Sequence, residues 1–387
     1  MGQVTSTGLI RDFTDDEARR ALPLKWGAVE PGVLPAWVAE MDYAVAEPIE
    51  AALRRAIDEG AFGYPPFENG AELGEAYSGF SQRHFGHTVD PDQVLPVVDV
   101  TAGVRLVLDV LCDPGPVVLP TPAYHPQLQV VPVAGRELWE LPVDPDAPTA
   151  ELDLDRLDAL FAAGARTLLL THPHNPLGHV YGRAELEGIR DVALRHGARV
   201  ISDEIHGPLV LPGATHVPYL SLEGTAEHGI AVLAASKAFN TAGLRCAQLV
   251  TADPSTRDVL RDVPMVRNDS WSILGVVASV AAYAEGDAWL AALVDRLDGQ
   301  RQLLASLLAE HLPKARMRPL AATYLAWIDL RGYGHDDPAA LALDPGRVRL
   351  ENCRRYQPGL TGHVRLNIAT SPERLTEIVR RLGVALG

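Results

Sequence analysis

The sequence predicts an α/β fold with a mainly parallel sheet, followed by a smaller α+β unit. Two observations support this prediction. Apolar, strand-like runs alternate with helix-like segments between residues 166 and 237, as in proteins with helices on both faces of a parallel sheet. In addition, Asn175, Asp203 and Lys237 each lie at or just after the end of such a run. Because parallel strands end at the same edge of a sheet, these side chains are expected to share one crevice.

The composition is that of a globular protein with one large core and a smaller one beside it, at 387 residues and 47% hydrophobic. Apolar runs are too short for a membrane span and the first residues lack a secretory pattern, so we expect a cytoplasmic protein without a membrane partner. Cys112, Cys246 and Cys353 are too scattered for a disulfide framework or a zinc motif, and no metal is expected. A formal charge of -16 argues against a nucleic-acid partner.

Three units follow one another along the chain. Residues 1–47 are expected to form an N-terminal arm, with a short helix near 15–21, and part of the small domain. Residues 48–286 are expected to form the large domain and 287–387 the small C-terminal domain. Pro48 and the apolar spacing after it predict a helix that ends at Gly60. Further strands are expected at 116–120, 166–171, 198–202, 229–235, 323–330 and 362–369, and helices at 101–111, 183–196, 287–311, 338–343 and after Ser371.

Lys237 is one of only three lysines, against 31 arginines. An amine can form a Schiff base, whereas a guanidinium cannot. A lysine that is partly desolvated at a strand end would have a lowered pKa and could act as nucleophile and base. An ordinary exposed loop lysine is the alternative for this residue alone. The polar residues at the neighbouring strand ends favour the chemical interpretation.

Other positions suggest a binding site, each with a plainer alternative. Thr101 as N-cap and Gly103 behind it could bring backbone amides to a phosphate. Tyr124, in the turn after a buried strand, could stack on a planar ligand or simply pack. Arg365 could form a fork for a carboxylate or lie on a solvent face. Asp203 in an apolar strand end needs a cation or several donors, and a protonated ring nitrogen would serve.

Together these residues resemble a known family. The chain from about Leu22 to its end resembles fold-type I enzymes that use pyridoxal 5'-phosphate, the aspartate aminotransferase superfamily, whose large domain has a mainly parallel, seven-stranded sheet. Within that superfamily it resembles the MalY/PatB group of cystathionine β-lyase-like carbon-sulfur lyases. The motifs that carry the resemblance are Trp37-Val-Ala-Glu-Met-Asp, Phe62-Gly-Tyr, Pro173-His-Asn-Pro-Leu-Gly, Ser202-Asp-Glu-Ile-His, Ser236-Lys-Ala-Phe-Asn-Thr-Ala-Gly-Leu and Val364-Arg-Leu-Asn-Ile-Ala.

The resemblance implies a role for each matching residue. Lys237 would carry the cofactor and move a proton at the substrate α-carbon, and Asp203 would pair with the pyridine nitrogen. Arg365 would bind the substrate α-carboxylate. The other implied cofactor contacts are Asn175 at the phenolic oxygen, Tyr124 and His206 beside the ring, Gly103, Val104, Ser236 and Arg245 at the phosphate, and Tyr64 from a second subunit. The residues implied to contact the substrate also include Tyr64, Trp37 and Asp42.

The implied reaction is α,β-elimination from a cysteine S-conjugate or cystathionine, giving a thiol, pyruvate and ammonia in a homodimer with shared active sites. An aminotransferase is the alternative, as is a specialised biosynthetic enzyme that decarboxylates or deaminates a bulky S-conjugated amino acid. A cofactor-binding regulator is disfavoured because no helix-turn-helix precedes the sheet. Residues 352–359 and 266–271 depart from the family pattern. Arg267, Arg354 or Arg355 could be solvated charges or, if facing the pocket, could select an anionic or bulky substrate.

Overall fold

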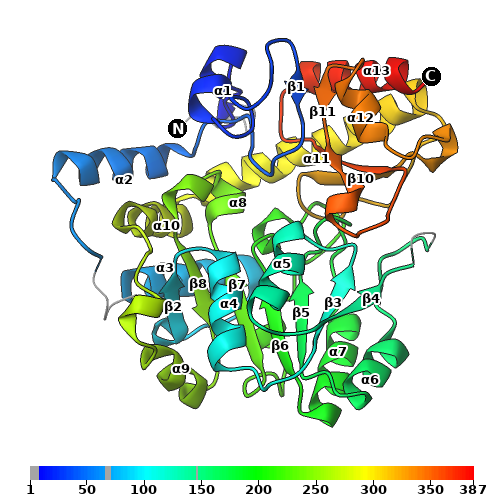
Figure 1. Cartoon of the computed structure of the whole chain (residues 1–387). Coiled ribbons are helices and arrows are strands. Elements are labelled where there is room, and N and C mark those ends of the chain that lie inside the picture. The colour runs from blue at the N-terminus through cyan, green and yellow to red at the C-terminus, as the bar shows by residue number, and fades with distance from the viewer. Residues whose placement is uncertain (1–7, 66–70, 145–146) are drawn as a thin grey trace.

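A computed structural model describes residues 8–65, 71–144 and 147–387 and has a central sheet of seven strands (Figure 1). The strand order is β2-β8-β7-β6-β5-β3-β4, and β8 runs in the opposite direction to the other described strands of this sheet. The mainly parallel sheet predicted from the alternation is therefore confirmed. The strands are β2 (Val94–Val97), β3 (Val117–Thr121), β4 (Leu138–Pro142), β5 (Thr167–Thr171), β6 (Arg199–Asp203), β7 (Gly229–Leu233) and β8 (Ala247–Val250).

Both faces of this sheet are covered, which explains its nearly continuous apolar strands. Along β5 and β6, Leu169 and Ile201 pack on one side with α4 (Val100–Val110) and α5 (His125–Val133). Leu168 and Val200 pack on the other side with α6 (Leu154–Ala162) and α7 (Arg183–His196). The remaining helices of this unit are α2 (Glu47–Asp58), α3 (Ala71–Phe85), α8 (Ser236–Phe239), α9 (Pro254–Arg261) and α10 (Ile273–Glu285).

The second unit is an antiparallel sheet with the order β12-β13-β10-β9, flanked by helices (Figure 1). The long helix α11 (Asp287–His311) leads into it, and α13 (Pro372–Leu386) packs along α11. Ser371 caps α13 by accepting a hydrogen bond from the amide of Arg374, as predicted. The other elements are β9 (Arg316–Met317), β10 (Leu325–Asp329), α12 (Pro338–Leu343), β11 (Val348–Arg349), β12 (Glu351–Asn352) and β13 (His363–Asn367).

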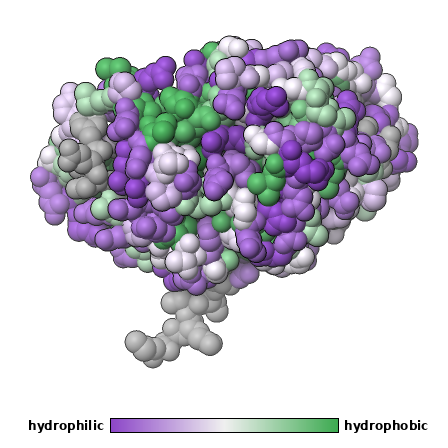
Figure 2. All heavy atoms as spheres, turned by 90° about the horizontal axis from the view of Figure 1, so that it is seen from below, coloured by the Kyte–Doolittle hydropathy of each residue, from purple (hydrophilic) through white to green (hydrophobic). Residues whose placement is uncertain are grey.

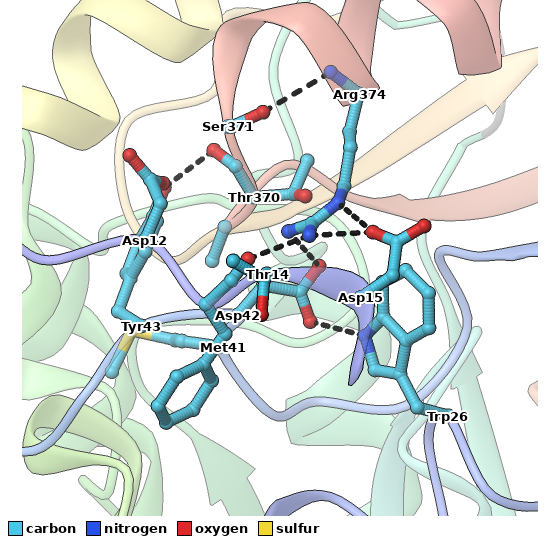
Figure 3. A network of polar contacts seen from close by, with 12 residues as sticks. Asp12, Thr14, Asp15, Trp26, Met41, Asp42, Tyr43, Thr370, Ser371 and Arg374 are labelled. Carbon is cyan, nitrogen blue, oxygen red and sulfur yellow. Dashed lines mark hydrogen bonds and ion pairs between the residues drawn. The ribbon is translucent and has the colours of Figure 1, made fainter. Parts of the chain in front are cut away.

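The N-terminal segment joins the second unit. After α1 (Asp15–Ala21), β1 (Leu34–Pro35) pairs in parallel with β11. Figure 3 shows polar contacts of the N-terminal segment. Trp26 Nε1 donates to Asp42 Oδ1 at 2.7 Å, and the guanidinium of Arg374 binds the carboxylate of Asp15. The same oxygen of Asp42 pairs with the fully buried Lys25 at 2.8 Å. The buried polar contacts of Asp42 therefore help to hold residues 36–43 in place.

Surface features bear on partners and location. Within the described ranges, no single helix has the length and apolar composition of a membrane span; only the bent pair α10 and α11 passes that test together. Figure 2 shows a mostly hydrophilic face on which one larger hydrophobic area and several smaller ones are exposed. The initial residues, to which the expected lack of a secretory signal refers, lie outside the part of the chain that is described.

Candidate active site

A cavity of about 430 Å³ lies at the carboxyl ends of the parallel strands, in the size range of small-molecule sites. Its floor includes Asn175, Asp203 and Lys237, which follow or end β5, β6 and β7. Its opposite wall includes Trp37 and Arg365, from the N-terminal segment and β13. The expected convergence of the three strand-end residues is therefore confirmed.

Lys237 lies in the first turn of the short helix α8, immediately after β7. Its Nζ donates to the carbonyl oxygen of Ala39 at 2.9 Å. Burial, with a smaller contribution from the charge of Arg365, lowers the pKa of Lys237 to about 8. A neutral, nucleophilic amine is therefore accessible near physiological pH, which excludes the ordinary exposed lysine as an explanation.

Asp203 ends β6 and is almost completely buried. Its Oδ2 accepts from Gln127 Nε2 at 2.8 Å, and its Oδ1 accepts from the amide of Ile205 at 3.3 Å. Burial raises the pKa of Asp203 to about 7 because these two donors only partly replace water. A cation placed beside this carboxylate would relieve that cost.

Arg365 is buried in β13, so the alternative of a solvent-facing charge is wrong. It donates to the carbonyl oxygen of Trp37 at 2.7 Å and to Asn175 Oδ1 at 3.2 Å. Its Nε has no hydrogen-bond partner among the described residues. The guanidinium therefore joins both walls of the cavity and keeps donor capacity for a carboxylate.

Tyr124 and His206 also line the cavity. Burial raises the pKa of Tyr124, so its phenol stays neutral at physiological pH. Burial, reinforced by the Lys237 and Arg365 charges, lowers the pKa of His206 to about 3. The His206 ring is therefore neutral, and its Nδ1 lacks a hydrogen-bond partner within the described ranges.

The structure differs from the expected phosphate site at the start of α4. Helix α4 begins at Val100, and its N-cap is Asp99, whose side chain accepts from the Ala102 amide at 2.8 Å; Thr101 is not the cap. Gly103 and Val104 lie outside the cavity. The Gly103 amide donates to Asp99 O, and a Cβ on Gly103 would lie 3.0 Å from Val232, so close helix–sheet packing requires this glycine.

Other groups at the same end of the cavity can bind an anion. Val100 and Thr101, in the first turn of α4, line the cavity together with Ser236 and Arg245. Arg245 has a positive φ of 56° and pairs with Asp99 at 2.8 Å. A helix N-terminus, a hydroxyl and a guanidinium together suit a phosphate.

Asp42 and Tyr64 do not line the cavity. Asp42 is buried in the ion pair with Lys25 and is therefore unsuited to the expected substrate contact. Tyr64 is 88% exposed, beyond the end of α2. A contact of Tyr64 with the site of a second subunit stays a prediction.

The sequence did not decide which of three arginines faces the cavity. Arg355 lines the cavity, whereas Arg354 and Arg267 do not. Arg355 pairs with Glu351, another lining residue, at 3.1 Å. Arg354 points to Asp337 instead, at 3.8 Å.

The sequence analysis missed several residues that contact or orient Asp203 and Lys237. Thr171 Oγ1 donates to Gln127 Oε1 at 2.8 Å, which turns the Gln127 amide group toward Asp203. Tyr324 donates to the same Ala39 oxygen that accepts from Lys237. The only signal for Gln127 was its place one turn after Tyr124; nothing local marked the backbone of Ala39.

These residues fit pyridoxal 5'-phosphate. The cavity offers a partly buried amine with a lowered pKa, a buried carboxylate with a raised pKa, and an anion site at the N-terminus of α4. Across the described residues, no cluster of three or more histidine, cysteine or acidic side chains could hold a metal ion. The fold and site therefore define a pyridoxal-phosphate enzyme of fold type I.

Comparisons with known proteins agree. The family model for aminotransferase class I and II matches residues 38–382, and the chain belongs to this family. Cystathionine β-lyase of Corynebacterium glutamicum is 35% identical, with 96% of this chain and 98% of that protein covered. A structure from Corynebacterium diphtheriae, provisionally assigned as a pyridoxal-phosphate-dependent β-cystathionase, is 33% identical with a TM-score of 0.92. The match covers 97% of this chain and 99% of that chain. The pyridoxal-phosphate-bound C-S lyase of Staphylococcus hominis is 26% identical, with a TM-score of 0.88 and coverage of 98% and 99%.

Proposed function

We propose that this chain is a pyridoxal-phosphate-dependent carbon-sulfur β-lyase that acts on a cysteine thioether. The observation that carries the proposal is the placement of Lys237, Asp203 and Arg365 around one cavity, in a chain whose relatives include cystathionine β-lyase. The overall reaction takes up water and releases a thiol, pyruvate and ammonia.

The residues divide the work of the elimination. When bound, pyridoxal 5'-phosphate supplies an aldehyde that reacts with amines and a ring that accepts the electron pair left at the α-carbon. Asp203 stabilises a proton on the ring nitrogen. Arg365 binds the substrate α-carboxylate and orients the α-carbon. Lys237, with a pKa of about 8, removes the α-proton before the thiolate leaves from the β-carbon.

The lining of the cavity supports the remaining cofactor contacts of this proposal. Ser236, Arg245 and the first turn of α4 bind the phosphate in this proposal, in place of the Gly103 and Val104 amides. Tyr124 and His206 lie beside the ring, and Asn175, already fixed by Arg365, donates to the phenolic oxygen from its amide nitrogen.

We also propose a homodimer in the cytoplasm. Phe62, Tyr64 and Val266 are apolar or aromatic side chains exposed by 70%, 88% and 82% in the single chain. Burial against a second copy would remove this surface from water. Tyr64 would then reach the cavity of the partner subunit.

One assay tests the reaction. The purified protein is incubated with cystathionine, with S-phenylcysteine and, separately, with a plain amino acid plus 2-oxoglutarate, and thiol, pyruvate and glutamate are measured. We expect equal amounts of thiol and pyruvate from a thioether. Glutamate without thiol would identify an aminotransferase and overturn the proposal.

A further inference from the structure

Glu351 and Arg355 form a charged pair at the cavity wall that the proposed chemistry does not use. Their ion pair is 3.1 Å long, and their side chains are 13% and 49% exposed. Both residues line the same cavity as Lys237 and Arg365. The pair is therefore in contact with whatever fills the cavity and is still open to solvent.

The position of the pair relative to the α-carboxylate site follows from the strand register. Glu351 in β12 lies directly opposite Arg365 in β13. Side chains at opposite positions of antiparallel strands lie on the same face, with Cβ atoms about 5 Å apart. Arg355 follows one turn later in the chain and reaches back to Glu351. A substrate held at Arg365 by its α-carboxylate therefore has the pair as a neighbour.

The segment that carries Arg355 is also tied to the large domain. The amide of Ala123 donates to the carbonyl oxygen of Tyr356 at 2.9 Å, and His125 Nδ1 hydrogen-bonds to that of Arg355 at 3.1 Å. Both contacts adjoin Tyr124, which lies beside the proposed cofactor ring. The backbone under Arg355 is thus fixed relative to the reacting centre.

We infer that Glu351 and Arg355 recognise a second amino-acid head on the leaving group of the substrate, Arg355 binding its carboxylate and Glu351 its ammonium. This inference rests on the proposed lyase function. A zwitterionic head can replace the internal ion pair with two new ones, so neither protein charge loses its partner. An anion alone would separate Arg355 from Glu351 and leave that largely buried carboxylate unpaired.

A series of thioethers tests this assignment. Cystathionine carries both charges on its leaving group, S-(3-carboxypropyl)cysteine only the carboxylate, S-(3-aminopropyl)cysteine only the ammonium, and S-propylcysteine neither. We expect wild-type kcat/KM to be highest for cystathionine. Arg355→Gln should lower the ratio of cystathionine to S-propylcysteine by about tenfold, the lower end for a hydrogen bond to a charged group, because Arg355 is half exposed. Arg355→Lys should restore part of the ratio.

The neighbouring arginine supplies a matched control. Arg354 is equally exposed, at 49%, but pairs with Asp337 outside the cavity. Arg354→Gln should leave every ratio unchanged. Glu351→Gln should remove the preference for cystathionine over S-(3-carboxypropyl)cysteine. Because each ratio is measured on one enzyme preparation, loss of folded protein cancels.

The outcomes separate this inference from the reaction itself. If wild-type protein cleaves none of the four thioethers, the proposed lyase function fails. If it cleaves them and Arg355→Gln lowers all four rates equally, or Arg354→Gln has the same effect, the lyase stands and the recognition role is wrong.

Discussion

The two walls of the cavity are built in different ways. The sheet-side wall consists of Asn175, Asp203 and Lys237, which lie at the ends of parallel strands in the seven-stranded sheet; Asn175 and Asp203 are buried and Lys237 is partly buried. The opposite wall combines the N-terminal segment, β13 and the loop after β12, and it carries the partly exposed Arg355. In the proposed reaction, the first wall holds the groups for bond breaking and the second wall contacts the leaving group of the substrate.

This difference assigns chemistry and selectivity to separate parts of the chain. Burial on the sheet-side wall lowers the pKa of Lys237 to about 8, which suits a general base near physiological pH, and raises the pKa of Asp203 to about 7, which favours a cation beside its carboxylate. On the other wall, Arg355 and Glu351 pair beside solvent. Changes there should alter which substrate reacts rather than whether reaction occurs.

The largest expected effect is on the sheet-side wall, at Lys237. Lys237→Ala should lower kcat by about 10³-fold or more, since the variant loses the group proposed both to carry the cofactor and to move the α-proton. Borohydride reduction followed by mass spectrometry should find the cofactor attached at this side chain only in the wild type. A variant with full activity would contradict the assignment.

A substitution beneath the second wall should change stability instead. Lys25 and Asp42 are 0% and 1% exposed, so Lys25→Met removes the close cation of a buried carboxylate that keeps, among the described residues, only Arg374, 4.0 Å away, as a charged partner, and should lower the free energy of unfolding by about 3 kcal/mol. Urea unfolding measures this. Arg11→Ala, which breaks the exposed pair with Glu17, is the control and should lower the free energy of unfolding far less. Similar losses in both variants would show that burial does not set the difference.

Arg365 links the two walls, and its loss should affect substrate binding. Arg365→Gln should lower kcat/KM for every thioether by about 10²-fold, as expected for a charge-assisted hydrogen bond to a carboxylate. Arg365→Lys should recover only part of this because an ammonium lacks the planar fork. Steady-state kinetics would reveal the effect; unchanged kcat/KM would show that the α-carboxylate binds elsewhere.

At Asp203 we expect a change of slope in stability against pH. The pKa of Asp203 is about 7 in the folded chain, above the value of about 4 for an unfolded aspartate. Between these values the folded chain holds more protons, so the free energy of unfolding without cofactor should fall as pH rises from about 4 to 7. Asp203→Asn should flatten this slope. Denaturant titrations from pH 4 to 8 measure it, and parallel wild-type and variant curves would contradict the burial argument.

Sequence reasoning worked well where local pattern and fold coincide. Strand–helix alternation placed β5, α7, β6 and β7 to within two residues, and strand polarity then brought Asn175, Asp203 and Lys237 together. The same reasoning left the antiparallel strand β8 and the helices α3 and α10 unassigned. Those elements carry no motif, and their positions are set by tertiary packing.

The second wall was harder to predict because its contacts join residues far apart in the chain. Arg354 and Arg355 look alike in sequence, and only the turn after β12 sends one to the cavity and the other to Asp337. Asp42 belongs to a motif of the family but faces Lys25. The capping of α4 by Asp99 rather than Thr101 depends on a backbone conformation that both residue types allow.

The attachment of residues 36–43 has a practical consequence for producing this protein. Asn240, three residues after Lys237, exchanges hydrogen bonds with the backbone of Met41 and also donates to that of Tyr43, while Asn367 donates to those of Val38 and Glu40. A truncated chain that starts after residue 43 would lack the N-terminal part of the second cavity wall. Crystallisation or biosensor fusions should therefore keep this stretch and place tags upstream of α1.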